Sequence, residues 1–171
     1  MELGIVADTH GFFHPDLTDV FDGVDMIVHA GDIGDLAILD GLKTVAPVRA
    51  VFGNIDDADT RRRLPEHERF EVGGVSVWIT HIAGRPGRWQ QNMDTRLAGD
   101  PPDLFICGHS HILRIERVPE FNNMLFVNPG AAGRYGFHQK KTCVRLTIED
   151  GQATGADVIH LDAPESPQTD V

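Results

Sequence analysis

ELGIVADTHG, residues 2–11, begins with an apolar run that ends in an acid, and a histidine follows two residues later. The apolar part has the length and composition of a buried β-strand. The same pattern recurs in DMIVHAGD (25–32), which also ends in an acid, and in VRAVFGN (48–54), which ends in Gly-Asn. The stretches between these runs, PDLTDVF (15–21) and DLAILDGLKTV (35–45), have the apolar spacing of short helices. This βαβαβ order predicts a largely parallel sheet with right-handed crossovers.

The chain beyond residue 69 is richer in predicted strands. RFEVGGVSVWITH (69–81) predicts two short strands around a Gly-Gly turn, and PDLFICGHSH (102–111) predicts a strand that runs into two histidines. GRPGRWQQNMDTRLAG (84–99), between them, predicts a loop that leads into a helix. Further strands are predicted in LRIERV, MLFVN, TCVRLTIED and ATGADVIHL. The predicted class is therefore α/β, with an α/β half followed by a mostly β half.

Length and charge restrict the function. A chain of 171 residues suits one domain with a sizeable core. With 26 acidic and 15 basic residues, the net charge is −11. This charge argues against sequence-independent nucleic-acid binding, which depends on Lys and Arg. It leaves open a small phosphate ester held by a metal ion.

Segment composition gives the expected boundaries and location. No segment reaches the ~18 apolar residues of a membrane span, and MELGIVADTHG lacks the basic leader of a signal peptide. Cys107 and Cys143 lie in apolar runs, which predicts buried free thiols and a reducing, cytoplasmic location. We expect a single domain over residues 1–162 and a disordered polar tail over 163–171.

Polar residues of one chemical kind follow five of the predicted strands. They are Asp8, His10, Asp32, Asn54, His81, His109 and His111. Ligands of open α/β sheets bind beyond the carboxyl ends of the strands. Asp8 with His10, and His109 with His111, are two residues apart, which places each pair on one side of an extended chain. The set offers oxygen and nitrogen but no thiolate.

Seven such ligands exceed the needs of one tetrahedral ion. They suit two ions of five or six coordination that share a bridging carboxylate and bound water. Mixed carboxylate and imidazole ligands favour manganese, iron, cobalt, nickel or zinc over calcium or copper(I). The sequence therefore predicts two divalent transition-metal ions, with manganese preferred. Taken singly, Asp8 and Asp32 could instead be helix N-caps, and Asn54 could be a turn residue.

The remaining histidines are not predicted to bind metal. His29 is predicted to be buried and hydrogen-bonded, with support of a metal ligand as the alternative. His14, His67 and His160 are predicted to lie at the surface. His138, in GRYGFHQKK, is not expected to serve in a substrate loop.

Other charged groups are expected in solvent. These are the acids Asp56, Asp57 and Asp59 and the basic run Arg61-Arg62-Arg63. Arg85 and Arg88, in GRPGR, are expected to be solvated, with contact to a substrate phosphate as the alternative. Asn128-Pro129-Gly130 is predicted to form a turn that lines the site.

ADTHG, HAGD, FGN, ITH and CGHSH, in this order, resemble the motifs of the calcineurin-like metallophosphoesterases. The short length resembles their small branch, which includes bacterial phosphodiesterases, and the resemblance extends over about residues 1–162. It implies a four-layer αββα sandwich. It also implies that one metal ion is held by Asp8, His10 and His111, a second by Asn54, His81 and His109, and that Asp32 bridges both.

The resemblance further implies the chemistry. Two such ions share and acidify a hydroxide that attacks phosphorus, so no protein nucleophile is needed. Asn54 and His109 are the residues expected to act directly in catalysis, and the Asn54 amide can donate to a phosphate oxygen. Larger members of the family often carry a histidine directly after the motif asparagine, proposed to protonate the leaving group, but this chain has Ile55. We therefore expect a preference for esters whose leaving groups need little help. We also expect a phosphodiesterase rather than a phosphomonoesterase.

Three other functions compete with a phosphodiesterase. A retromer-type scaffold on the same fold is the main alternative, although such scaffolds tend to have altered ligands. A zinc hydrolase of the β-lactamase type is discounted because HSH is followed by Ile112-Leu113 rather than completing HxHxDH. A nucleotide-cofactor enzyme is disfavoured because no GxGxxG follows the first strand. The expected partner is a small phosphoester, and a homo-oligomer is left open.

Overall fold

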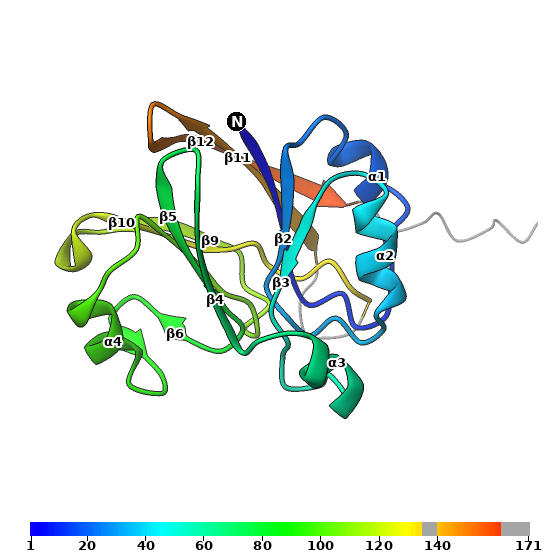
Figure 1. Cartoon of the computed structure of the whole chain (residues 1–171), viewed down its shortest axis with the longest axis horizontal. Coiled ribbons are helices and arrows are strands. Elements are labelled where there is room, and N and C mark those ends of the chain that lie inside the picture. The colour runs from blue at the N-terminus through cyan, green and yellow to red at the C-terminus, as the bar shows by residue number, and fades with distance from the viewer. Residues whose placement is uncertain (135–139, 162–171) are drawn as a thin grey trace, which may run out of the picture.

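The chain folds into two five-stranded sheets that pack face to face (Figure 1). The computed structural model describes residues 1–134 and 140–161. The strands of the first sheet are, in order across it, β12 (Gln152–Leu161), β11 (Lys141–Glu149), β1 (Glu2–Val6), β2 (Met26–His29) and β3 (Val48–Ala50). Those of the second sheet are β4 (His67–Val72), β5 (Val75–Thr80), β8 (Leu104–Ile106), β10 (Met124–Asn128) and β9 (Arg114–Val118).

Each sheet has a parallel centre and antiparallel flanks. β1, β2 and β3 pair in parallel, as the βαβαβ pattern predicted, and so do β5, β8 and β10. β11 and β12 extend the first sheet, and β4 and β9 flank the second, by antiparallel pairing. The first sheet is therefore less parallel than a βαβαβ unit alone suggests.

Helices cover the outer faces of the sandwich. The helices are α1 (Leu17–Val20), α2 (Ala37–Lys43), α3 (Ala58–Arg63) and α4 (Met93–Gly99), with a 3-10 turn η1 (Pro119–Phe121). Figure 1 shows α1 and α2 on one side of the molecule and α4 on the other, with the sheets between them. A two-stranded ribbon, β6 (Gly84–Arg85) with β7 (Arg88–Trp89), occupies part of the stretch that was predicted to be a loop.

The alternation of side chains along the strands sets these layers. In β8, Leu104 and Ile106 face the core between the two sheets, whereas Phe105 faces outward and packs with Met93 and Leu97 of α4. Successive side chains of a strand point to opposite faces, so a fully apolar strand needs a partner layer on both sides. Each such buried side chain contributes roughly 1.5–3 kcal/mol to folding.

The first sheet follows the same rule. Leu3 and Ile5 of β1 lie in the core between the sheets, while Val6 packs with Leu17 of α1 and Leu42 of α2. The layer order is therefore helix, sheet, sheet, helix. This confirms the predicted αββα sandwich.

Both cysteines are buried and unpaired, as the apolar runs around them predicted. Cys107 and Cys143 are buried free thiols, and burial raises the pKa of each to about 12. None of the helices in residues 1–134 and 140–161 is long and apolar enough to cross a membrane. The predictions for His138 and for a tail over 163–171 concern residues outside those described.

Candidate metal centre

Seven polar side chains meet where strands of both sheets end. The strands concerned are β1, β2 and β3 of the first sheet and β5 and β8 of the second. We define the first cluster as Asp8, His10 and His111. The second cluster is Asp32, His81 and His109, with Asn54 against His81. The structure thus brings together all seven residues that the sequence singled out.

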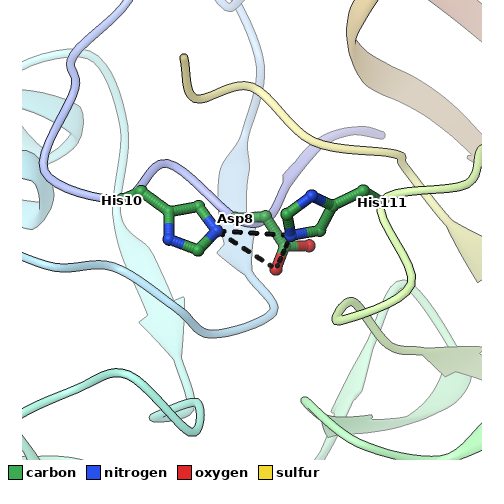
Figure 2. A group of neighbouring side chains, drawn as sticks. All are labelled: Asp8, His10 and His111. Atoms are coloured by element: carbon green, nitrogen blue, oxygen red, sulfur yellow. Dashed lines mark hydrogen bonds and ion pairs between the residues drawn. The ribbon is translucent and has the colours of Figure 1, made fainter. Parts of the chain in front are cut away.

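The first cluster joins the loop after β1 to the loop after β8. Nε2 of His10 lies 3.2 Å from Nε2 of His111, which lies 3.2 Å from Oδ1 of Asp8. Figure 2 shows both imidazole rings and the carboxylate turned toward one another. The Asp8 side chain is buried, and the two rings are partly exposed. The cluster therefore presents two nitrogens and a carboxylate oxygen to one point at the edge of solvent.

The second cluster is organised around His81, which follows β5 directly. Its Nδ1–H donates to the carbonyl of Ala30 at 2.7 Å, which leaves the lone pair of a neutral ring on Nε2. Nε2 lies 3.2 Å from Oδ1 of Asp32 and 3.1 Å from Oδ1 of Asn54. The ring of His109 meets the ring of His81 edge-on, with centroids 5.3 Å apart. A backbone carbonyl that fixes the far nitrogen is the usual way to orient a metal-binding histidine.

One carboxylate lies between the two clusters. Oδ1 of Asp32 is the oxygen next to His81, while its Oδ2 lies 4.0 Å from Nε2 of His10. On the other side, Oδ1 of Asp8 lies 3.9 Å from Nε2 of His81. The two clusters are therefore contiguous rather than separate sites.

The donor atoms of this centre fit a pair of cations. Oδ1 of Asp8 is buried and faces two imidazole nitrogens, Nε2 of His111 at 3.2 Å and Nε2 of His81 at 3.9 Å. Nε2 of a neutral His81 ring would face oxygens of Asp32 and Asn54 with no proton between them. Such facing lone pairs are unfavourable at a buried position unless a cation or a proton lies among them. The residues are also of the types that bind divalent transition metals.

The pKa values of three of these side chains reflect the attraction between imidazoles and carboxylates. The adjacent Asp8 carboxylate raises the pKa of His111. Burial by itself would lower the pKa of His81, but the carboxylates of Asp32 and Asp8 raise it above its ordinary value. Burial would raise the pKa of Asp32, but His81 and the backbone N–H of Ile55 hold it below its usual value. Opposite charges thus stabilise one another in this centre.

The two other imidazoles are kept neutral. Burial is the largest cause that lowers the pKa of His10 and that of His109. Because a neutral imidazole is the form that binds a metal, both rings are ready to act as ligands near pH 7.

The backbone of the centre is unusual. Asp8, His10, Asp32, His109 and His111 have φ between 49° and 67°, in the left-handed region. Such conformations cost of order 1–3 kcal/mol each in residues other than glycine and collect at functional sites. The paired side chains therefore converge through left-handed turns, and not through the extended chain that the i, i+2 spacing suggested.

Two glycines allow the closest approaches within the centre. A Cβ at Gly53 would overlap the carboxylate and the backbone nitrogen of Asp32, and one at Gly108 would lie 2.9 Å from Oδ2 of Asp8. The motif glycines are thus needed because backbone and carboxylate touch.

Asp56 was expected in solvent, and that expectation is wrong. It is buried, and its carboxylate accepts hydrogen bonds from the backbone N–H groups of Ile33, Gly34 and Gly53 at 3.2, 2.8 and 2.7 Å. These groups belong to the loops after β2 and β3, which carry Asp32 and Asn54. Asp56 therefore ties together the two loops that build the second cluster.

Arg61 is exposed, as expected, but it also contacts the loop that carries Asn54. Its guanidinium donates to the carbonyls of Gly53, Asn54 and Asp56 at 2.7–3.1 Å and lies over the ring of Phe52. Three carbonyls held by one cation fix the loop that carries Asn54. The sequence signal for the roles of Asp56 and Arg61 is an acid and an arginine shortly after the motif asparagine. This signal is weak, because the groups that the two side chains bind are backbone atoms, some of them distant in sequence.

The rest of that charged segment behaves as expected. Asp57 accepts from the N–H of Thr60 and caps α3, while Arg62 and Arg63 pair with Asp59 at the surface. These side chains contribute to the helix and leave the metal centre alone.

His29 supports the first cluster through Thr9, which lies between Asp8 and His10 in the chain. Its predicted burial is confirmed. The hydroxyl of Thr9 donates to the carbonyl of Ile33, so it accepts from Nε2–H of His29 at 3.0 Å. The N–H of Gly31 donates to Nδ1 of His29 at 3.2 Å. Both ring nitrogens are satisfied only in the neutral form, and burial lowers the pKa of His29 to about 4.

Two of the three histidines expected at the surface are not there. His14 is buried, and its Nδ1 accepts from the N–H of Asp16. His67 is half-buried, with its ring against Trp78. His160 is exposed, as predicted.

Asn128 lines the site as expected and also braces it. Its side-chain amide donates to the carbonyl of Gly108 and to the hydroxyl of Ser110, at 2.8 and 3.1 Å. Both acceptors lie in the GHSH loop, so Asn128 sets the position of His109 and His111.

A two-sheet αββα sandwich with a carboxylate and imidazole double cluster at its strand ends has the architecture of the metallo-dependent phosphatases. The chain belongs to the calcineurin-like phosphoesterase superfamily, whose domain model matches residues 1–151. A protein described as a probable metallophosphoesterase from Methanothermobacter thermautotrophicus is 32% identical, covering 96% of this chain and 95% of the relative. Another from Methanocaldococcus jannaschii is 32% identical, covering 88% and 77%.

Solved structures show the same fold. An archaeal protein described as a novel phosphodiesterase has a TM-score of 0.77 at 22% identity, covering 94% of this chain and all of that one. Zinc-bound Vps29 of Entamoeba histolytica has a TM-score of 0.70 at 19% identity, covering 95% and all of that chain. The family resemblance is thereby confirmed. Both curated relatives are archaeal, although the resemblance was drawn to a bacterial branch.

Proposed function

We propose that the protein hydrolyses phosphodiesters at a pair of divalent transition-metal ions, with manganese as the preferred metal. Asp8, His10 and His111 would hold one ion, and Asn54, His81 and His109 would hold the other. The observation that carries the proposal is the position of Asp32, whose two oxygens face different clusters. A carboxylate in that position is suited to bridge two ions.

The metal pair, when bound, supplies an activated water and neutralises charge on the phosphate. The chain holds the ligands in place through Asp56, Arg61, Asn128 and His29. Asn54 is exposed, and with its Oδ1 toward His81 its amide nitrogen remains free to donate to a phosphate oxygen. The exposed ring of His109 is proposed to contact the substrate as well.

The missing acid favours esters whose leaving groups need little protonation, and we propose that the substrates are diesters rather than monoesters. Ile55 follows Asn54 and is 46% exposed, so its apolar side chain stands beside the centre and cannot give a proton to a leaving group. The fold likeness to an archaeal protein described as a phosphodiesterase supports this choice. We further propose a cytoplasmic location, for which the two buried thiols are the support.

The test is hydrolysis of bis(p-nitrophenyl) phosphate by protein stripped with chelator and then given manganese, nickel, cobalt, iron(II) or zinc. We expect no turnover without metal, restoration by at least one ion, and about two ions per chain by elemental analysis. Asp40→Asn is the control for loss of a carboxylate, because Asp40 is exposed on α2 and pairs with Lys43. Absence of metal-dependent turnover with every ion would refute the proposal.

A scaffold function is the second candidate. The likeness to Vps29 favours it, and Ile112 is 63% exposed near the centre. All seven candidate ligands are intact, which weighs against it. A stable protein partner together with no turnover would make the scaffold the better account.

A further inference from the structure

A cavity of about 430 Å³ opens beside the second cluster. Its lining includes His109, so it is continuous with the metal centre. Arg85, Arg88 and Trp89 of the β6–β7 ribbon form part of its wall. A volume of this size is typical of a small-molecule site. We call this cavity the arginine pocket.

The ribbon places its two arginines side by side. Pro86 and Gly87 form the turn, with Gly87 at φ 75°, which suits proline followed by a left-handed glycine. Arg85 pairs with Arg88 across the ribbon, so both side chains project from the same face. Like charges directly opposite each other destabilise a strand pair. Both side chains are exposed, so water screens this repulsion, and an anion between the two guanidinium groups would turn it into attraction.

The described part of the chain leaves this charge unneutralised. No described carboxylate lies within ion-pair distance of Arg85 or Arg88, and Arg85 donates only to the carbonyl of Pro86 at 3.4 Å. By contrast, the side chain of Arg114, which also lines the pocket, pairs with Glu116 at 2.9 Å. Acids outnumber bases 26 to 15 in this chain, so two free arginines at one cavity are unexpected.

The pocket also has an apolar part. Phe126 and Ile112 contribute to the wall, and Ile112 is 63% exposed. The ring of Trp89 packs against Phe126, with centroids 5.8 Å apart. An aromatic group in the pocket would cover these apolar side chains.

We propose that the arginine pocket binds one ester arm of the substrate, and that this arm is an aromatic group carrying a second anion. The scissile phosphate would lie at the metal centre, and the second anion would lie between Arg85 and Arg88. Guanidinium groups bind phosphate and carboxylate in a bidentate manner, so the pair would select such arms over uncharged ones. This inference rests on the proposed function.

The test compares two substrates that differ in one anion: adenylyl-(3′→5′)-adenosine, ApA, and the same dinucleotide with a 5′-terminal phosphate, pApA. Products are separated by chromatography so that only cleavage of the internal diester is counted. We expect kcat/KM to be about 10- to 100-fold higher for pApA, and this ratio to fall below about threefold in Arg85→Gln/Arg88→Gln. Arg62→Gln/Arg63→Gln removes two surface arginines from α3 and should keep the wild-type ratio.

The outcomes separate the two proposals. Equal cleavage of ApA and pApA by the wild type would overturn the pocket assignment and leave the proposed function standing. If no diester is cleaved, the proposed function fails, and binding to metal-free protein decides the pocket. Quenching of tryptophan fluorescence by AMP but not adenosine, lost in the double variant, would support the anion site. Equal or absent quenching by AMP and adenosine would overturn it.

Discussion

The two clusters of the centre have the same kinds of donor but different supports. The first cluster is braced by neutral groups. Thr9, next to Asp8 in the chain, is hydrogen-bonded to the neutral ring of His29 and to the carbonyl of Ile33. The second is braced by charged groups, because Asp56 and Arg61 clamp the loops around it. Charged clamps hold backbone more tightly, since hydrogen bonds to ions are the stronger ones.

Because of this difference, the two clusters should fail for different reasons. The second cluster should depend most on packing and on its clamps, whereas the first should depend on keeping His29 uncharged. Asp32 belongs to the second cluster but faces both clusters. Its loss should therefore weaken both of them together.

The largest effect is expected for Asp32→Asn. Without the carboxylate between the clusters, turnover of a phosphodiester should fall about 10³-fold, because the amide neither bridges nor neutralises two cations. Bound metal should fall from about two ions per chain to one or none, measured by elemental analysis. Retention of two ions and of near-normal turnover would show that the clusters work independently.

Alanine substitutions at two glycines, one beside each cluster, test how tightly each cluster is packed. Gly53→Ala forces a methyl group into Asp32 and should lower turnover about 100-fold and stability by about 2–4 kcal/mol. Gly108→Ala meets Oδ2 of Asp8 less closely and should cost less on both measures. Chemical denaturation and metal-reconstituted activity report the two effects. The reverse order would contradict the tighter packing of the second cluster.

Asp56→Asn tests the charged clamp. Loss of the ionised acceptor for three backbone N–H groups should cost about 2–3 kcal/mol and weaken metal binding about 10- to 100-fold. Asp57→Asn is the matched control, because asparagine caps a helix about as well as aspartate. Similar behaviour of the two variants would mean that Asp56 does not organise the second cluster.

His29→Gln tests the neutral brace through pH. The folded-state pKa of His29 is lowered to about 4, against 6.5 ordinarily, so the unfolded chain takes up a proton first as the pH falls. The stability from the neutral ring is thus complete above pH 6.5 and is lost toward pH 4, by roughly 3 kcal/mol at most.

Urea unfolding between pH 7 and pH 4 gives the measurement for His29. The variant should lack this part of the pH dependence, whereas His160→Gln, at an exposed position, should keep it. Identical pH profiles for wild type and His29→Gln would rule out a buried neutral ring.

Much of the fold followed from local sequence. Apolar runs such as LFI at 104–106 predict strands because a strand buried on both faces has no polar positions. The seven polar residues at strand ends were found in the same way, since an acid or histidine is conspicuous after an apolar run. Their roles as metal ligands stay a prediction.

Tertiary structure alone decided which charges are buried and how the ligands converge. Asp56 and Asp57 are adjacent acids, yet one binds three backbone N–H groups in the interior and the other caps an exposed helix. Nothing local distinguishes them, because the N–H groups that Asp56 binds include those of Ile33 and Gly34, more than twenty residues away. The left-handed turns at Asp8 and His10 likewise depend on distant segments, because their N–H groups donate to the carbonyls of Gly31 and Asp32. Sequence therefore specified the chemistry of the centre, and long-range packing specified its geometry, because burial and pairing are properties of the assembled chain.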